Sequence, residues 1–299
     1  MTDKIENNNI IYIFCSISQK EIDNVNSWLI PSLIKQEGLF NIILILINYT
    51  GIGEIYQGEK IVNNLTVKEI NKNKQCGFGE AHNFAFSVFQ PQKFFLIVNP
   101  DVYLHNQCIS MMIQRLDKNE RIGIVEARQL PFEHPKEYEL TTGETPWASG
   151  SCMLIKSQCF QEINGFDENF WMYCEDVDLS WRTWLSDYKV IYEPMAVCYH
   201  FTGGYFSYRE DRYYLENFWC ARNFIYLMFK FWGENGEARA IEMLNSTHYP
   251  PNFKNEVINS IEAIIKNNKN NFYNKFKDKI NELHNIIKIT GFNMYHEVR

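Results

Sequence analysis

Three acidic residues lie within four positions directly after an aromatic segment. Glu175, Asp176 and Asp178 follow the aromatic residues of 170–173 and precede Arg182. Ionised side chains in apolar surroundings cost free energy unless they are paired or take part in chemistry. On a helix, Glu175 and Asp178 lie one turn apart and Asp176 points elsewhere. We therefore consider this segment the start of a helix that brings carboxylates into a pocket, where one could act as a general base.

A structural interpretation explains part of the same segment. Asp178 and Arg182 have i,i+4 spacing, which suits a plain salt bridge. Acidic residues in a first helical turn also complement the helix dipole. Neither effect explains why the acids follow an aromatic run and the Asn-Gly-Phe-Asp turn at 164–167.

The turn Asn99-Pro100-Asp101 is a second candidate, because it ends an apolar strand pattern. A carboxylate there could hold a divalent cation that also binds a diphosphate, since hard cations prefer oxygen ligands. The alternative is an ordinary turn, because Asn, Pro and Asp are all common in turns.

Two further segments combine glycine with a residue that could contact a ligand. Gly77 begins a Gly-Phe-Gly turn before a helical pattern that contains Asn83, and helix N-termini favour anions. Trp147 could stack on a sugar face, and Gly150 leaves room for one. The alternatives are a loop-to-helix junction for the glycine turn and a core position for the tryptophan.

The surrounding pattern alternates between strands and helices. Apolar segments at 10–17, 40–47, 61–67 and 93–98 predict buried strands, and residues 21–36 and 80–89 have helical spacing. This order predicts an α/β fold with a mixed, mostly parallel sheet flanked by helices. Ligands bind such sheets at the carboxyl ends of strands, where Ser16, Asn48 and the 99–101 turn fall.

The composition and periodicity of the sequence change near residue 208. An aromatic helix is expected at 212–232, and amphipathic helices follow Pro250-Pro251. We therefore predict a catalytic-type domain at 1–207 and a helical extension at 208–299. The aromatic helix could cap the domain or contact a membrane peripherally. We favour capping, because a peripheral helix normally displays a cleaner basic face.

Composition narrows the possible partners and compartment. Twenty-nine basic and thirty-six acidic residues give a net charge of −7, which argues against nucleic-acid binding. The eight cysteines contain no CxxC pair, which indicates free thiols in a reducing compartment and not a disulfide framework or a zinc site. The N-terminal residues lack a signal-peptide pattern, and the apolar runs are too short to span a bilayer. A cytoplasmic location is expected.

Together these segments resemble family 2 glycosyltransferases. The segment 175–182 is similar to the acceptor-side motif of that family. The Asn99-Pro100-Asp101 turn resembles the variant of the aspartate-x-aspartate motif that rhamnosyltransferase-like members carry. The glycine turn at 77–83 and the Trp147–Gly150 segment occur in matching order. The resemblance spans residues 10–233 and implies a GT-A fold.

The resemblance also implies roles for single residues. Asp176 would be the general base, and Asp101 with His200 would hold Mg²⁺ or Mn²⁺, although a lone histidine at a strand end is often incidental. Ser16, Asn48, Gly77, Asn83 and Asn99 would line the donor nucleotide, with Asn83 alternatively bracing a strand end. Contacts to the sugar or acceptor would come from Trp147, Gly150, Glu175 and Arg182.

The activity implied is inverting transfer from a nucleotide-diphosphate sugar, with dTDP-rhamnose or a UDP-sugar as the leading donor. The acceptor would be a surface-polysaccharide or lipid-linked glycan, which would place the chain in the cytoplasm or at the inner face of the cytoplasmic membrane. One alternative is a non-catalytic sugar- or nucleotide-binding module on the same fold. Another is a nucleotidyltransferase, but the N-terminal region lacks the glycine-rich, basic phosphate loop usual in that class.

Overall fold

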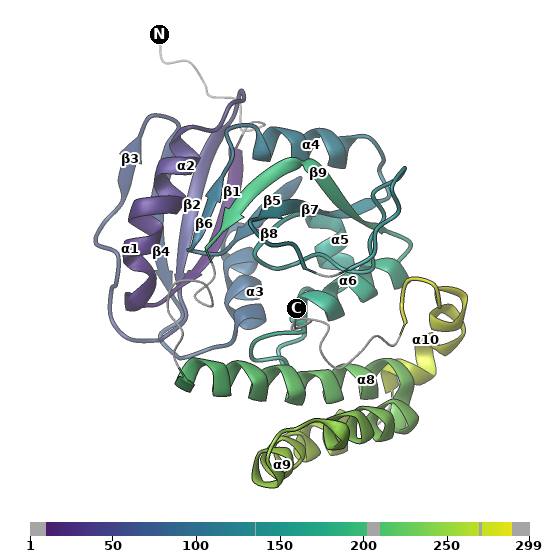
Figure 1. Ribbon diagram of the computed structural model, residues 1–299. Coiled ribbons are helices and arrows are strands. Elements are labelled where there is room, and N and C mark those ends of the chain that lie inside the picture. Colours follow the sequence, from purple (N-terminus) through teal and green to yellow (C-terminus); the bar gives the residue numbers. More distant parts are fainter. Residues whose placement is uncertain (1–9, 135, 202–209, 269–270, 289–299) are drawn as a thin grey trace.

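The computed structural model describes residues 10–134, 136–201, 210–268 and 271–288 (Figure 1). Within these ranges a nine-stranded sheet has the order β3-β4-β2-β1-β5-β8-β7-β9-β6. Helices cover both of its faces, so the expected α/β fold class is confirmed.

The N-terminal part of the sheet is parallel. β1 (Ile10–Ile17) lies between β2 (Asn41–Asn48) and β5 (Phe94–Val98), and β4 (Leu65–Asn71) pairs with the outer edge of β2. The central strands are almost continuously apolar because helices cover both faces, which leaves few positions for polar side chains. Their carboxyl ends lie at one edge of the sheet.

The remaining strands make the sheet mixed. β8 (Cys152–Lys156) runs antiparallel to β5 and to β7 (Ile122–Leu130), and β9 (Lys189–His200) runs parallel to β7. The short β6 (Val102–Leu104) pairs antiparallel with the end of β9, so that Val102 lies opposite His200. This pairing brings the turn after β5 next to the end of β9.

Two hydrophobic clusters occupy the two faces of the sheet. The helical turns η2 (Gln19–Glu21), α1 (Ile22–Asn24), η3 (Val25–Leu29) and α2 (Ile30–Ile34) share one face with α4 (Cys108–Asp117). The other face carries α3 (Phe78–Phe89), α5 (Ser157–Glu162), α6 (Glu175–Leu185) and α8 (Glu210–Ser246), with α9 (Pro251–Asn268) and α10 (Asn271–Glu282) packed on α8. In Figure 1, α8 runs beneath α3 and α6.

One predicted strand was wrong. Residues 61–67 do not form a single strand but belong to a hairpin of β3 (Lys60–Val62) and β4. Asn63 adopts a positive φ of 56° between the two strands, a conformation that asparagine tolerates and that a continuous strand cannot contain. Strand β9 has a register irregularity opposite Ala127 and Arg128.

The aromatic helix packs against the domain. Phe224, Ile225, Leu227, Met228 and Phe231 of α8 are buried in the same cluster as residues of α3 and α6. This packing agrees with the capping interpretation. Gly233 has φ 64° and interrupts α8 directly after the predicted helix end. The predicted domain boundary at 207/208 lies outside the described residues.

Two other findings concern the composition. All eight cysteines are buried and free, as the absence of paired spacing suggested. Across the described ranges, no helix combines the length and the apolar character that crossing a bilayer requires.

A buried ion-pair network links α6 to α8. Asp178 is fully buried; its Oδ2 accepts from Nε of Arg182 at 2.8 Å and lies 2.7 Å from Nη2 of the same guanidinium. Its Oδ1 lies 2.5 Å from Nζ of Lys230 on α8. Lys230 also contacts Oδ2 of Asp167 at 2.7 Å. The carboxylate of Asp167 is largely buried, which by itself raises its pKa, but the Lys230 ammonium overcomes this effect and holds the pKa at about 2.

The substitution Lys230→Met should lower the free energy of unfolding by about 3 kcal/mol at neutral pH, because it leaves two buried carboxylates short of a cation. Urea denaturation measures the loss. The matched control Lys266→Met removes an exposed i,i+4 pair with Glu262 and should change stability by less than about 0.5 kcal/mol. Equal effects of the two variants would contradict this account of the network.

Candidate active site

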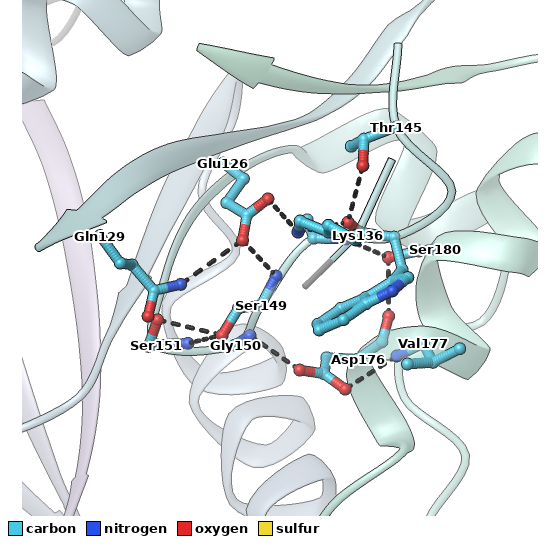
Figure 2. Close-up of polar contacts among 12 residues, drawn as sticks. Glu126, Gln129, Lys136, Thr145, Ser149, Gly150, Ser151, Asp176, Val177 and Ser180 are labelled. Atoms are coloured by element: carbon cyan, nitrogen blue, oxygen red, sulfur yellow. Dashed lines mark hydrogen bonds and ion pairs between the residues drawn. The ribbon is translucent and has the colours of Figure 1, made fainter. Parts of the chain in front are cut away.

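Asp176 lies in the first turn of α6 with its carboxylate fixed by two backbone groups. Its Oδ2 accepts from the Gly150 N–H at 3.0 Å, and its Oδ1 accepts from the Val177 N–H at 2.9 Å (Figure 2). Asp176 is only 7% exposed. A carboxylate offers about four lone-pair sites, so these bonds orient it and leave capacity to accept a proton.

The loop before α6 has an unusual backbone. Tyr173 and Cys174 both have positive φ, at 70° and 68°. Such conformations cost of order 1–3 kcal/mol each and persist only where surrounding contacts enforce them. The Asn223 side-chain amide on α8 donates to the carbonyls of Met172 and Tyr173 at 2.6 and 2.8 Å. Helix α8 therefore holds the turn that places Asp176.

Asp101 and His200 meet at the carboxyl ends of β5 and β9. Oδ1 of Asp101 lies 3.3 Å from Nε2 of His200, and the Asn99 amide nitrogen lies 3.4 Å from the same ring atom. The Asn99 backbone N–H donates to the Ser151 carbonyl at 2.9 Å, which ties the turn to the segment before β8. The structure thus brings His200 against Asn99 and Asp101, although about 100 positions separate it from that turn in the sequence.

This group fits a hard divalent cation. Two ligands bound at right angles about 2.1 Å from an ion lie about 3 Å apart, close to the Asp101–His200 separation. Carboxylate oxygen suits both Mg²⁺ and Mn²⁺, and imidazole nitrogen favours a transition metal such as Mn²⁺. Among the described residues, no group of three or more His, Cys, Asp and Glu side chains forms a complete metal cage. A cation here would therefore keep positions open for phosphate oxygens and water.

A buried charge pair next to the site was not anticipated from the sequence. Glu126 on β7 is 2% exposed and forms an ion pair with Lys136, which also donates to the Trp147 carbonyl at 2.7 Å. Glu126 Oε1 accepts from the Ser149 N–H at 3.0 Å (Figure 2). Burial raises the pKa of Glu126 and lowers that of Lys136, while the pairing opposes both shifts. The sequence feature that could have indicated this pair is the single carboxylate, Glu126, in the apolar segment 122–127.

Trp147 is a core residue in this arrangement. Its ring is 3% exposed, with the Lys136 ammonium 4.2 Å from its centroid. Gly150 follows it at a crowded position, because a Cβ there would lie 3.2 Å from the ring of Phe78 and 3.8 Å from Cβ of Asp176. Gly150 thus lets the backbone approach Asp176 closely enough to donate to it.

Gly77 also serves a close backbone approach, but to protein. A Cβ at Gly77 would lie 2.4 Å from the Trp171 carbonyl oxygen, which accepts from the Phe78 N–H at 2.9 Å. The start of α3 is therefore packed against the 166–171 loop. Asn83 has a bracing role as well: its side chain donates to the Phe166 carbonyl at 3.0 Å and accepts from the Phe166 N–H at 2.9 Å.

Asn48 and Ser16 lie at the ends of their strands as expected. Asn48 is fully buried, and its amide group donates to the carbonyls of Ile52 and Gly53 and to Glu69. Its Oδ1 accepts from the backbone and hydroxyl of Thr50. Asn48 therefore shapes the loop after β2. Ser16 is partly exposed in β1.

Glu175 and Arg182 lie on α6 with Asp176 but have different surroundings. Arg182 pairs with Asp178 and donates to the Ile163 carbonyl at 2.6 Å, so its guanidinium is occupied within the protein. Glu175 is 5% exposed, and its Oε2 has no hydrogen-bond partner among the described residues. Burial, followed by the nearby Asp176 carboxylate, raises the pKa of Glu175 well above its usual range.

Comparisons with known proteins agree with this architecture. No family model matches the chain. A 67-residue stretch is 37% identical to rhamnosyltransferase WbbL of Escherichia coli (strain K12), covering 22% of this chain and 25% of that protein. A stretch of the same length is 39% identical to N-acetylglucosaminyl-diphospho-decaprenol L-rhamnosyltransferase of Mycobacterium tuberculosis, covering 22% of each. The chain thus matches about a quarter of the length of these relatives.

Solved structures extend the likeness over most of the fold. The mannosyltransferase PcManGT from Pyrobaculum calidifontis, in complex with GDP-Man and Mn²⁺, superposes with a TM-score of 0.54 at 11% identity over 93% of this chain and 84% of that one. GalNAc-T7 with UDP, GalNAc and Mn²⁺ gives 0.50 at 11% identity, over 64% and 43%. The expected GT-A fold is confirmed, and the resemblance to rhamnosyltransferases is supported over the matched stretch.

The substitution Glu175→Gln should raise the melting temperature at pH 7. The raised pKa means that the folded state resists ionisation of Glu175, whereas the unfolded chain ionises near the usual value of 4.5. The stabilising contribution of the protonated form is complete below that value and is lost as pH rises toward the folded pKa. The gain from glutamine should therefore shrink as the pH falls to about 4. Thermal melts across pH measure it, with the exposed Glu262→Gln as control; a gain independent of pH would contradict the assignment.

Proposed function

We propose that this GT-A-fold chain is a nucleotide-sugar glycosyltransferase of the rhamnosyltransferase type. The proposal rests on two groups of residues that lie together at one edge of the sheet. In one, Asp176 accepts from Gly150; in the other, Asp101 contacts His200. The link between them is the Asn99 N–H bond to the Ser151 carbonyl. The matched stretch of two rhamnosyltransferases supports the sugar class.

In this proposal Asp176 acts as the general base in an inverting displacement. The carboxylate takes the proton of an acceptor hydroxyl as that oxygen attacks the anomeric carbon, and the bond from that carbon to the diphosphate oxygen breaks. The two backbone bonds to Asp176 keep its orientation fixed while its charge changes. A preorganised base avoids reorganisation during the reaction.

The leaving diphosphate carries negative charge into a protein whose own net charge is −7. A divalent cation held by Asp101 and His200 would supply the compensating charge when bound. Both structural relatives were solved with Mn²⁺ and a nucleotide or nucleotide sugar, which supports this assignment over a metal-free site. In the absence of a cation, the Asn99 amide contacts the same ring nitrogen, Nε2.

The donor is a nucleotide-diphosphate sugar, with dTDP-rhamnose or a UDP-sugar as first candidates, and the acceptor is a glycan or lipid-linked glycan. The mycobacterial relative, named for a diphospho-decaprenol acceptor, supports the lipid-linked class. Such an acceptor would bring the chain to the inner face of the cytoplasmic membrane. Gly150 and Glu175 remain proposed contributors to the sugar side, whereas the buried Trp147 is not proposed to touch the sugar. Gly77 and Asn48 are proposed to act on the nucleotide side through the loops they shape.

The substitution Asp176→Asn should lower transfer by about 10²–10⁴-fold while leaving donor binding unchanged, because the amide cannot accept the proton. Release of nucleoside diphosphate measures turnover, and calorimetry measures donor binding. Asp187→Asn is the matched control, since the Asp187 side chain is 75% exposed and forms an ion pair with Lys279 away from the site. Normal turnover in Asp176→Asn would rule out the general-base role.

The substitution Asp101→Asn should remove metal-dependent donor binding. Wild-type protein should melt at higher temperature with one nucleotide-diphosphate sugar and Mn²⁺ than with either alone, because a ligand that binds only the folded state stabilises it. The variant should lose that joint shift. Donor stabilisation without any turnover would favour a non-catalytic binding module, and no shift with UDP-, dTDP- or GDP-sugars would contradict the proposed donor class.

A further inference from the structure

Gln129 connects the Asp101–His200 group to the buried charge pair. It lies near the end of β7 and is 3% exposed. Its Oε1 lies 3.1 Å from Nδ1 of His200, and its Nε2 lies 3.4 Å from Oε1 of Glu126. The Glu126 contact is drawn in Figure 2. A single buried amide therefore touches both the histidine and the carboxylate.

The partners of Glu126 decide which way this amide faces. Glu126 receives the Ser149 N–H and the Lys136 ammonium, both of which can only donate. Because the Glu126 carboxylate accepts from both of these donors, it also accepts from Gln129. The amide NH₂ of Gln129 therefore points to Glu126. The amide oxygen is then left facing His200. Because that oxygen can only accept, Nδ1 of His200 must carry the hydrogen.

In the neutral ring, this tautomer leaves Nε2 of His200 without a hydrogen. Nε2 faces Oδ1 of Asp101 at 3.3 Å and the Asn99 amide nitrogen, which can donate to it, at 3.4 Å. A neutral imidazole with a free nitrogen lone pair is the form that binds a metal ion. In metal sites, the group that accepts from the other ring nitrogen selects the tautomer and fixes the ring orientation.

We propose that Gln129 is a positioning residue that holds His200 in the Nδ1–H tautomer, with Nε2 directed at the cation site beside Asp101. Gln129 acts through His200 and does not contact the substrate. The inference rests on the proposed function for its role in metal binding, whereas the tautomer itself is a property of the protein alone. Glu126 sets the orientation of Gln129 and also anchors Ser149, next to the Gly150 N–H that holds Asp176.

The direct test is the tautomer of His200 in the metal-free wild-type protein. Long-range ¹H–¹⁵N correlation spectra of histidine-labelled protein distinguish protonated from unprotonated ring nitrogens, and loss of one signal set in His200→Gln assigns the residue. At about pH 8, where an ordinary histidine is neutral, Nδ1 should carry the hydrogen. A hydrogen on Nε2 in the wild type would overturn the inference, whether or not the protein transfers sugar.

The substitution Gln129→Met tests the cause. Methionine keeps much of the volume but cannot accept from Nδ1, so the hydrogen should shift to Nε2, the site favoured in solvated imidazole. Titration with Mn²⁺ alone should then give an affinity about 10–100-fold weaker than wild type. An unchanged tautomer and affinity in folded Gln129→Met would contradict the role of Gln129.

Gln36→Met is the matched control. Gln36 is also a buried glutamine, 7% exposed, and donates to the carbonyls of Ser32 and His105 at 3.1 and 2.9 Å on the opposite face of the sheet. Its loss should cost similar stability without changing the His200 tautomer or the Mn²⁺ affinity. Equal changes in both variants would show a general structural effect and reject positioning by Gln129. Failure of Mn²⁺ to bind the wild type, with the tautomer as expected, would instead reject the metal role in the proposed function.

Discussion

The structure of this site depends on one buried charge, the carboxylate of Asp178. A charge removed from water requires close partners, and Asp178 finds them on its own helix in Arg182 and on α8 in Lys230. The ion pairs that neutralise Asp178 therefore join α6 to α8. The neighbouring contacts from α8 to Met172 and Tyr173 then hold the backbone turn that precedes Asp176. A residue without any proposed chemistry thus determines where the proposed base lies.

Much of the fold could be predicted from the sequence, because apolar segments of strand length alternate with helical spacing. The segment 61–67 was misread since its apolar residues conceal a turn at Asn63, whose positive φ depends on side-chain chemistry and not on hydrophobic periodicity. The pairing of β6 with β9 could not be predicted either. It joins strands nearly 100 residues apart, and no local pattern encodes such a contact.

Some residues of the site could likewise be proposed from the sequence, and others could not. Asp101 and Asp176 could be proposed from residue type and position, whereas His200 was proposed only from the family resemblance. The structure places Asp101 against His200. Glu126 and Lys136 could not be proposed, because a carboxylate in a strand and a lysine in a loop have no fixed spacing. At the glycine turn the structure shows the loop-to-helix junction that the sequence left open as the alternative, because Gly77 makes room for the Trp171 carbonyl. Crowding by a distant loop is visible only in three dimensions.

The contacts from α8 to the 167–173 loop have a consequence for how such proteins can diverge. Three side chains of α8 contact this loop. Arg222 donates to the Asn169 carbonyl, and Asn223 donates to the carbonyls of Met172 and Tyr173. Lys230 forms an ion pair with Asp167. A chimera that inherits this helix from one parent and the loop from another would combine mismatched halves. Recombination should therefore exchange the two segments together, despite the roughly 50 residues between them.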